Sequence, residues 1–396
     1  MQPDALTYDV VIIGGGPSGL STALHLQRIA PHLTHRILLL EKEQYPRLKL
    51  CAGGLTLDAE LLLERLGLDV NEVPHALAGE IRFDFEARGL SVRAFKRHAL
   101  RVIRRDEFDH WLAQKAQSRG VEIRQGVTVK NVIPQADEVL VETDKGTFHA
   151  QVVVGADGSN GVTRRCIFPS DPLNTARVLE VITRPHRPAG TSPKFKEIGG
   201  GREGVAYFEF SAVPENIAGY IWDFPTQVKG KPMRCWGIYD TNLLANGKRP
   251  PLKEPLAKEM ARFGFDLNDY ELKGHPIRWF SPQNRLSAPR VLLVGDAAGA
   301  DPIFGEGISI ALGYGALAAR EISEAFQRGE FSFRGFKRRV ARSALGQTLF
   351  VRWVIANVIY PLKWRWFQIL LWQVLKPFVL LAAWVFVLNW GKRMPA

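Results

Sequence analysis

The last 66 residues of the chain lack aspartate and glutamate altogether. The final acidic residue is Glu330, and eleven lysines and arginines follow it. The full sequence has 52 basic and 40 acidic residues, a formal net charge of +12, so nearly all of the excess positive charge lies in this C-terminal segment. The rest of the chain is close to neutral, which argues against a generally basic protein that binds nucleic acid.

Cysteine is also scarce. There are three, Cys51, Cys166 and Cys235, and their odd number and wide spacing exclude a disulfide framework and a zinc cluster. A reduced, cytosolic setting fits this usage best. The histidines are scattered as well, so we expect no metal site. The opening residues lack a basic segment followed by a long apolar run, and we therefore expect no signal peptide.

Internal repeats and low-complexity stretches are absent too. The 396 residues are 46% hydrophobic and 23% charged. This is the composition of a folded protein with a large core, and the length predicts about two domains. Disorder and collagen-like structure are excluded.

A βαβ unit is predicted near the N-terminus. Residues 8–13 are apolar and β-branched, and they lead through a glycine-rich turn into a helical pattern that continues to Leu26. A second apolar strand follows at residues 36–40. A strand, a glycine turn, a helix and a strand within about 35 residues are typical of a parallel sheet.

The turn of this unit carries a dinucleotide-binding fingerprint. Gly14, Gly16 and Gly19 have the GxGxxG spacing between a strand and a helix. Glycines at these positions let a pyrophosphate approach the free N–H groups of the helix N-terminus. Glu41 ends the second strand, where a carboxylate accepts hydrogen bonds from a ribose. The fingerprint by itself does not separate NAD from FAD.

Two later strand ends point to a flavin. The segment VVVGADGS ends a strand near Asp157, and RVLLVGDAA places Asp296 where it would bond a ribityl hydroxyl. The next turn contains Gly305 and Gly307 and opens another helix, whose N-terminal dipole favours the anionic N1/C2 edge of a reduced flavin. Glu306 lies in the same turn, and a helix-capping role is favoured over a role as catalytic acid.

Together these motifs resemble FAD-dependent enzymes with the para-hydroxybenzoate hydroxylase fold. GGGPSG, VVGADGSNGVTRR and RVLLVGDAAGADPIFGEGI are similar to the three FAD motifs of that superfamily, and the resemblance extends from residue 8 to about residue 325. The segment that begins at Arg105 matches its RxxFDxxL helix. The resemblance implies that FAD contacts Arg105 and that the backbone at Val129 meets the adenine.

Two further segments resemble the geranylgeranyl reductase family. PRLKLCAGGLT, residues 46–56, is similar to that family's PxxxxCGGG loop, with Ala52 in place of a glycine. The resemblance implies that Cys51 delivers a proton to a prenyl double bond, or positions that bond, as a hydride passes from flavin N5. From the residues alone, a cysteine is more often an inert small hydrophobe.

The second segment, YIWDFP, is similar to the family's YxWxFP motif, which lines a prenyl cavity. Tyr220, Trp222 and Phe224 alternate with other residues along the predicted strand, so their rings share one face. That face is either a cavity wall or part of an ordinary core. Both interpretations hold if the core is hollow.

The C-terminal segment is rich in tryptophan. Residues 349–390 hold six of the ten tryptophans, and residues 377–390 are apolar except for Asn389. At about 1.5 Å per residue this run reaches about 21 Å, short of a bilayer core of about 30 Å. A longer run would place Lys376 near the membrane centre. Interfacial attachment to anionic lipid is therefore favoured, with a buried helical cap and a true span as alternatives.

These patterns predict an α/β fold in which a Rossmann-type FAD-binding domain is interleaved with an antiparallel-sheet substrate domain, followed by a helical hydrophobic tail. The predicted ranges are 1–74, 100–170 and 285–330 for the FAD-binding domain, 75–99 and 171–284 for the substrate domain, and 331–396 for the basic, membrane-associating tail.

The expected activity is FAD-dependent reduction of carbon–carbon double bonds in a prenyl chain on a lipid, quinone or chlorophyll precursor. The electron donor would be NADPH or another reductant, including an electron-donor protein. The alternatives are a flavin-dependent monooxygenase of aromatic or quinone rings and a non-catalytic flavin-binding membrane scaffold. We expect peripheral or monotopic attachment to the cytoplasmic face of a membrane and no nucleic-acid partner.

Overall fold

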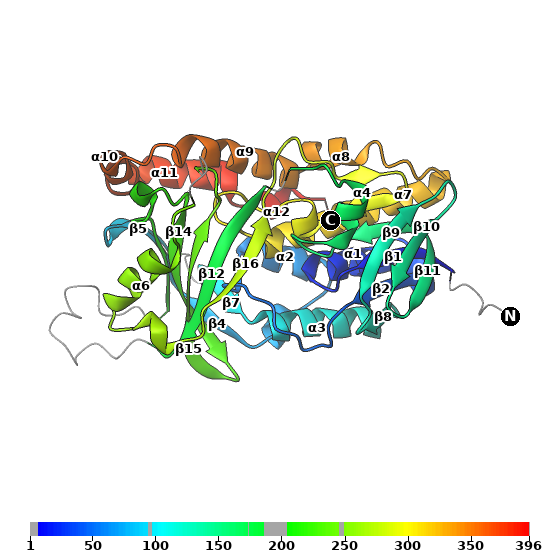
Figure 1. Ribbon diagram of the computed structural model, residues 1–396, viewed down its shortest axis with the longest axis horizontal. Coiled ribbons are helices and arrows are strands. Elements are labelled where there is room, and N and C mark those ends of the chain that lie inside the picture. The colour runs from blue at the N-terminus through cyan, green and yellow to red at the C-terminus, as the bar shows by residue number, and fades with distance from the viewer. Residues whose placement is uncertain (1–6, 94–96, 173, 186–203, 245–248, 396) are drawn as a thin grey trace.

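The computed structural model describes residues 7–93, 97–172, 174–185, 204–244 and 249–395. Two large sheets stand side by side along the long axis of the molecule, and a layer of C-terminal helices extends across both of them (Figure 1). The mixed α/β fold predicted from the sequence is confirmed, and it contains a third, smaller sheet.

The first sheet has eight strands and a parallel centre. Its order is β17-β18-β11-β1-β2-β8, and β10 and β9 are added through β11. The strands β18, β11, β1, β2 and β8 are all parallel. The bounds are β1 (Thr7–Ile13), β2 (Ile37–Glu41), β8 (Glu122–Gln125), β9 (Val129–Pro134), β10 (Val139–Thr143), β11 (Gly146–Gly155), β17 (Ser287–Ala288) and β18 (Val291–Leu293). The predicted βαβ unit is observed as β1, α1 (Pro17–Ile29) and β2.

The strand β1 is covered on both faces. Val10 and Ile12 pack in the core that includes α1 and α7 (Ile308–Arg328), whereas Val11 and Ile13 pack with β9 and β10. This accounts for the continuous apolar sequence, because a parallel strand between two covered faces has no solvent side. The carboxyl end of β1 is therefore held firmly where the glycine turn begins.

The second sheet has seven strands in the order β16-β12-β15-β14-β13-β5-β6. All neighbours are antiparallel except β13 and β5. The bounds are β5 (Glu80–Phe85), β6 (Arg88–Arg93), β12 (Thr175–Thr183), β13 (Val205–Glu209), β14 (Gly219–Val228), β15 (Lys231–Asp240) and β16 (Lys273–Arg278). On β14 the alternate rings of Tyr220, Trp222 and Phe224 share one core cluster, while Ile221 joins the cluster that includes α6 (Lys253–Ala261).

A three-stranded sheet in the order β3-β7-β4 packs against the second sheet, because β4 and β7 contact β14, and its strand β3 contacts the helix α7. Its bounds are β3 (Gly54–Leu55), β4 (His75–Ala78) and β7 (Leu100–Ile103). The other helices of the body are α2 (Leu57–Arg65), α3 (Arg105–Ser118), α4 (Val162–Ile167) and the short turns η1 (Pro31–Arg36), η2 (Val70–Glu72), η3 (Val213–Glu215), η4 (Leu267–Asp269) and η5 (Gly295–Ala297).

The C-terminal tail is helical and packs against the body. Its elements are α8 (Phe336–Arg342), α9 (Ala344–Ile359), α10 (Arg365–Ile369), the π-helical turn η6 (Leu370–Val374), α11 (Lys376–Ala382), the π-helical turn η7 (Ala383–Val387) and α12 (Trp390–Arg393). Trp390 is fully buried in the core that contains α7. Trp372 stacks on Phe210 in the second sheet, with ring centroids 4.1 Å apart. The inner side of the tail is thus a cap on both sheets.

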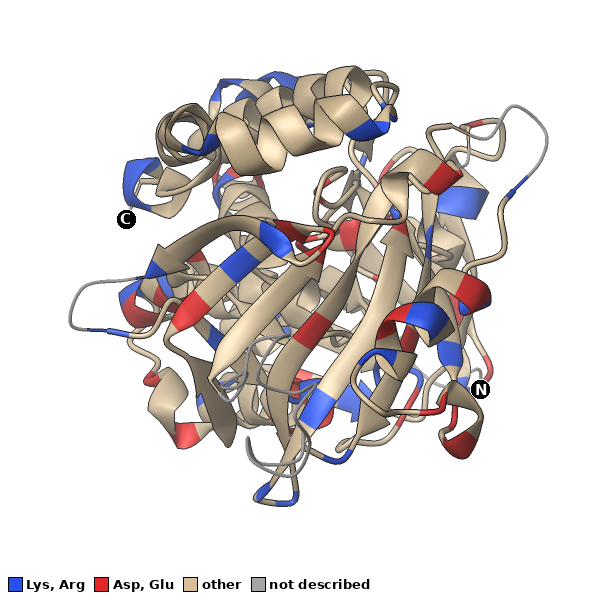
Figure 2. Cartoon of the chain, turned by 90° about the vertical axis from the view of Figure 1, so that its left-hand side faces the viewer, with Lys and Arg blue, Asp and Glu red and all other residues tan. Residues whose placement is uncertain are grey.

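The outer side of the tail is apolar and exposed. Phe378 is 70% exposed, Trp384 65% and Trp366 62%. In Figure 2 the tail helices lie at the top, where uncharged residues predominate. Within the described residues, no single helix has the length and apolar character needed to cross a membrane, although the segments Arg365–Val374 and Lys376–Arg393, bent by 77°, meet that test as a pair.

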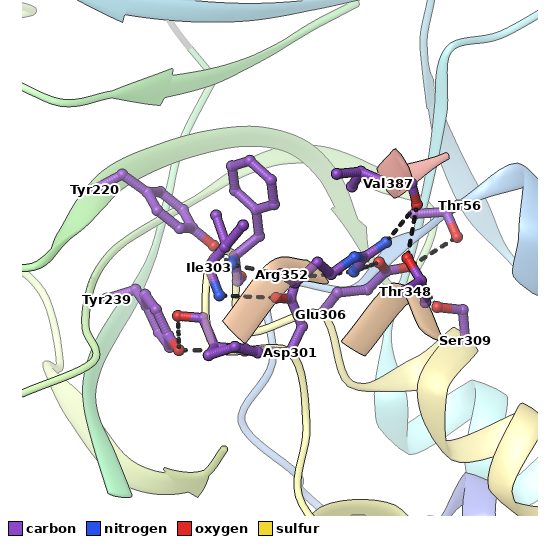
Figure 3. A network of polar contacts seen from close by, with 12 residues as sticks. Thr56, Tyr220, Tyr239, Asp301, Ile303, Glu306, Ser309, Thr348, Arg352 and Val387 are labelled. Atoms are coloured by element: carbon purple, nitrogen blue, oxygen red, sulfur yellow. Dashed lines mark hydrogen bonds and ion pairs between the residues drawn. The ribbon is translucent and has the colours of Figure 1, made fainter. Parts of the chain in front are cut away.

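Arg352 on α9 joins the tail to the body (Figure 3). Its Nη1 donates to Asp301 Oδ2 at 2.9 Å and to Glu306 Oε2 at 2.5 Å, and its Nη2 donates to the carbonyl oxygen of Val387 at 2.9 Å. Three segments that are far apart in the sequence therefore meet at one buried guanidinium. Burial raises the pKa of Asp301, and the positive charge of Arg352 opposes this shift.

Replacing Arg352 with methionine should lower the free energy of unfolding by about 3 kcal/mol, because it leaves two buried carboxylates without their cation. Denaturant unfolding followed by circular dichroism measures this change. The matched control is Arg365→Met, which removes an exposed pair with Glu86 and should change stability little. Equal losses of unfolding free energy in the two variants would show that Arg352 does not hold the tail to the body.

Candidate functional site

The larger cavity lies where the parallel strands of the first sheet end. Its volume is about 510 Å³, within the range of pockets that hold small ligands. Nine of the ten residues predicted to hold FAD line it: Gly14, Gly16, Glu41, Arg105, Val129, Asp157, Asp296, Gly305 and Gly307. The tenth, Gly19, lies behind the turn. The structure therefore brings together residues from six separate parts of the sequence.

The three fingerprint glycines have different roles in the structure. A Cβ on Gly14, which has φ +106°, would lie 2.4 Å from the carbonyl oxygen of Ala156, and one on Gly19 would lie 2.0 Å from that of Gly14. These two glycines permit the close packing of β1, α1 and β11. A Cβ on Gly16 would instead meet its nearest neighbour, Arg105 Nη2, at 3.7 Å. Gly16 keeps the cavity open at the start of α1.

The walls of this cavity suit an anion. The first turn of α1 has no acidic residue and no side-chain cap, so its N–H groups and the helix dipole attract negative charge. Arg47, Lys49 and Arg105 line the same cavity. Asp109 accepts from Arg105 at 2.7 and 2.8 Å and pairs with Arg47 at 3.1 Å. Burial lowers the pKa of Lys49, and the carboxylate of Asp296 opposes that shift.

The predicted carboxylates also bond to the protein. Glu41 accepts the N–H of Gly15 at 2.9 Å and lies 3.2 Å from Arg47 Nε. Asp157 accepts the N–H and the hydroxyl of Thr163, which leaves its buried Oδ1 without a partner among the described residues. A carboxylate oxygen without a donor in the wall of a cavity fits a ligand that carries hydroxyl groups, as the ribose and ribityl parts of FAD do. The residues present thus fit FAD.

A second, inner cavity of about 200 Å³ adjoins the first. Both cavities are lined by Cys51, His275 and Ile277 and by the turn that includes Gly305 and Gly307. Burial, with the charges of Lys49 and Arg105, lowers the pKa of His275 to about 4, so its ring is neutral at neutral pH. A group held in one cavity at this junction would face a group held in the other.

Cys51 lies at the junction of the two cavities. Its Sγ accepts the N–H of Gly53 at 3.4 Å. Burial raises the pKa of the thiol, and the guanidinium of Arg105 opposes the shift. The thiol is therefore protonated at neutral pH and can act as an acid rather than as a thiolate nucleophile.

Glu180 on β12 lies beneath the Cys51 loop and was missed by the sequence analysis. The backbone N–H of Cys51 is close enough to lower the pKa of this carboxyl, and its Oε2 has no partner among the described residues. Burial raises its pKa to about 7, against the opposing charges of Arg104 and Lys273. A glutamate in an alternating strand carries no sequence signal for this position, because the loop reaches it from far away in the chain.

The inner cavity has an aromatic wall. Tyr220, Trp222 and Phe224 line it, together with Phe208 and Phe304. The hydroxyl of Tyr220 donates to the carbonyl oxygen of Phe304, and Trp222 Nε1 donates to Cys235 Sγ at 3.5 Å, so their polar atoms have partners within the protein. The two interpretations of the YIWDFP strand are both realised, since the rings belong to a core cluster that encloses a cavity.

Glu306 does not cap the helix that follows it, so that expectation was wrong. The helix α7 has no side-chain cap, and Glu306 instead accepts from Thr56 at 2.9 Å, from Ser309 and from Arg352. Burial disfavours its charge, but Arg352 outweighs this and holds the pKa of Glu306 below its usual range. An ionised glutamate at neutral pH is no proton donor. The sequence could not show this, because Arg352 comes from the tail.

Gly16→Val should abolish FAD binding and leave the fold intact. The new side chain has room in the protein but fills the space beside the α1 N-terminus that an anionic ligand would occupy. Visible flavin absorbance of the purified protein measures the binding, and circular dichroism measures the fold. In the control Gly79→Val, where a Cβ meets nothing within 4 Å, flavin should be retained. A folded, flavin-loaded Gly16→Val protein would refute the placement of the cofactor.

Comparison with known proteins agrees with this geometry. Residues 7–193 match the FAD binding domain family. A digeranylgeranylglycerophospholipid reductase from Methanosarcina mazei is 27% identical over 82% of this chain and 77% of that protein. An uncharacterized protein from Methanosarcina barkeri is 28% identical over 85% of this chain and 80% of its own length.

Solved structures show the same fold. A geranylgeranyl bacteriochlorophyll reductase-like protein from Thermoplasma acidophilum aligns with a TM-score of 0.74, 21% identity and 98% of both chains. A variant of the halogenase PltM in complex with FAD aligns with a TM-score of 0.68 and 16% identity, over 91% of this chain and 78% of that one. Residues 7–193 are therefore similar to an FAD binding domain, and the chain is an FAD-dependent oxidoreductase whose similar proteins include one that is named a digeranylgeranylglycerophospholipid reductase.

Proposed function

We propose that this enzyme reduces carbon–carbon double bonds in the prenyl chain of a lipid, quinone or pigment precursor. The observation that carries the proposal is the meeting of two unlike cavities at Cys51. One has cationic walls and a helix N-terminus, which suit FAD. The other has aromatic walls, which suit a chain that is apolar and offers nothing to hydrogen-bond. A relative that is named for digeranylgeranyl lipid reduction supports the same substrate class.

The residues at the junction of the two cavities have different roles in the proposed reaction. Bound FAD, once reduced, supplies a hydride. Cys51 supplies the proton from its neutral thiol, so the double bond gains one hydride and one proton and is converted to a single bond. Glu180 lies near the backbone of the Cys51 loop and carries a dissociable proton near neutral pH. The aromatic wall holds the alkene and excludes water, which protects the reduced flavin from side reactions. NADPH or an electron-donor protein is the proposed source of electrons.

Oxidation of an aromatic ring is the competing function, because FAD-bound halogenases have the same fold. Ring hydroxylation and halogenation both consume oxygen, whereas alkene reduction does not. The apolar lining of the inner cavity favours a hydrocarbon chain over a phenol, which would need polar partners for its hydroxyl groups. A flavin-binding scaffold without activity would give neither product.

Cys51→Ala should lower the rate of alkene reduction by about 100-fold, because it removes the proton donor and leaves the flavin site in place. The assay supplies dithionite-reduced enzyme with a digeranylgeranyl glycerophospholipid under argon and follows loss of double bonds by mass spectrometry. The control Cys166→Ala lies on α4, outside both cavities, and should keep full activity. Oxygen-dependent modification of an aromatic substrate, without alkene reduction, would refute the reductase.

We also propose that the exposed face of the tail attaches the enzyme to the cytoplasmic face of a membrane. The support is a run of exposed apolar side chains in a segment that has no acidic residue after Glu330. Basic side chains accompany this run, and anionic lipid attracts such a combination. The buried inner side explains how the same helices remain folded against the protein.

Phe378→Glu combined with Trp384→Glu should weaken binding to anionic vesicles by at least about tenfold, because two exposed apolar side chains are replaced by charges that lipid repels. Co-sedimentation with phosphatidylglycerol vesicles measures binding. The control is Ile29→Glu at the end of α1, an exposed apolar residue outside the tail. Unchanged sedimentation of the double variant would rule out attachment through this face.

A further inference from the structure

One residue of the tail both lines the inner cavity and is exposed at the surface. Leu388 lines the cavity and is 41% exposed. Every other residue that lines this cavity is buried or only partly exposed. Among the described residues, Leu388 is therefore the part of the cavity lining that is most accessible from outside, and we treat its position as the mouth of the aromatic cavity.

The mouth opens within the apolar outer face of the tail. Leu388 follows η7, and Leu381, Trp384 and Val385, which precede it closely in the chain, are all exposed. Leu388 has an extended backbone, and Asn389 has the left-handed conformation with φ +61°. The helix thus ends at the mouth, and the chain then turns back into the protein.

The rim on either side of Leu388 is firmly held. On one side, the carbonyl oxygen of Val387 accepts from Arg352 at 2.9 Å and from Thr348 at 3.4 Å. On the other side, Trp390 is fully buried and the N–H of Gly391 donates to Asp58 at 2.9 Å. Leu388 lies between these two anchors. The position of Leu388 is therefore fixed by the fold, in part through Arg352, which itself lines the inner cavity.

The position of the mouth matters because of the cost of exposing a prenyl chain to water. The transfer of each methylene group from an apolar phase to water is unfavourable, and the cost adds up along the chain, so a long chain does not leave a bilayer readily. A mouth surrounded by lipid-facing side chains removes that cost. Lys392 and Arg393 follow the mouth in the sequence and are exposed, which suits an anionic head group that stays outside.

We infer that the prenyl chain of a membrane lipid enters the inner cavity sideways, directly from the lipid layer, past Leu388, while its anionic head group stays at the membrane surface. This inference rests on the proposed function, which supplies the prenyl nature of the chain. It adds the route by which the chain enters the cavity and the membrane as the source of the substrate. The substrate is then a lipid that remains anchored in the membrane, and the tail serves as the entrance to the active site as well as an attachment.

The first test narrows the mouth and leaves Cys51 and the aromatic wall of β14 unchanged. Leu388→Trp should slow labelling of the cavity by about tenfold or more, because a bulky ring fills the entrance. The probe is a digeranylgeranyl glycerophospholipid that carries a diazirine on the prenyl chain, embedded in phosphatidylglycerol vesicles. After illumination, mass spectrometry locates the label, which should fall on β14 in the unchanged protein. This measurement requires no turnover.

The matched control is Leu381→Trp, which lies on the same exposed face and does not line the cavity. The rate at which the probe labels β14 in this variant should be within about twofold of the rate in the unchanged protein. Vesicle co-sedimentation should be the same for both variants, so that a loss of labelling reports entry and not attachment. Equal labelling of β14 in Leu388→Trp and the unchanged protein would overturn the inference.

A second measurement separates this inference from the proposed function. Rates of double-bond loss are compared for the vesicle-embedded lipid in the unchanged protein and both variants. If the unchanged protein reduces the lipid and Leu388→Trp does so equally fast, the function holds and the entrance is wrong. If no variant reduces the lipid but β14 labelling still depends on Leu388, the entrance holds and the reaction is wrong.

Discussion

The contact on which much of this protein depends is the buried guanidinium of Arg352. It neutralises Asp301 and Glu306, which flank the turn that separates the two cavities, and it holds the carbonyl oxygen of Val387 at the cavity mouth. A charge in such a position is stable only when its partners are in place. The tail, the cofactor-facing turn and the entrance are therefore parts of one arrangement, and the tail is no separable appendage.

The two cavities show how one fold can hold two chemically opposite ligands. The centre of the first sheet is parallel, so its strands end together and give glycine turns, helix N-termini and cations to one polar site. The second sheet is largely antiparallel and gives one aromatic face of β14 to an apolar site. Cys51 can serve both sites because its loop crosses the line where they meet. Selectivity for a hydrocarbon then comes from the largely apolar, aromatic wall of the inner cavity.

The tail combines a buried inner side with an exposed apolar outer side, although its sequence presents a buried cap and membrane attachment as alternatives. Its inner side packs as firmly as a core, with Trp390 fully buried, while its outer side leaves Phe378 and Trp384 exposed. Bent helices allow this, since short segments can turn different faces to the protein and to the outside. A helix long enough to cross a bilayer would not leave the cavity mouth at its edge.

The sequence by itself determined the βαβ unit, the glycine fingerprint, the cofactor class and the aromatic face of β14, because each depends on local spacing and periodicity. Only the tertiary structure decided the roles of Glu180, Glu306 and Leu388. Glu180 on β12 lies near the Cys51 loop, and an arginine from the tail keeps Glu306 ionised. Such contacts join residues that are far apart in the chain, and no local pattern encodes them, because burial and charge pairing are set by the packed fold.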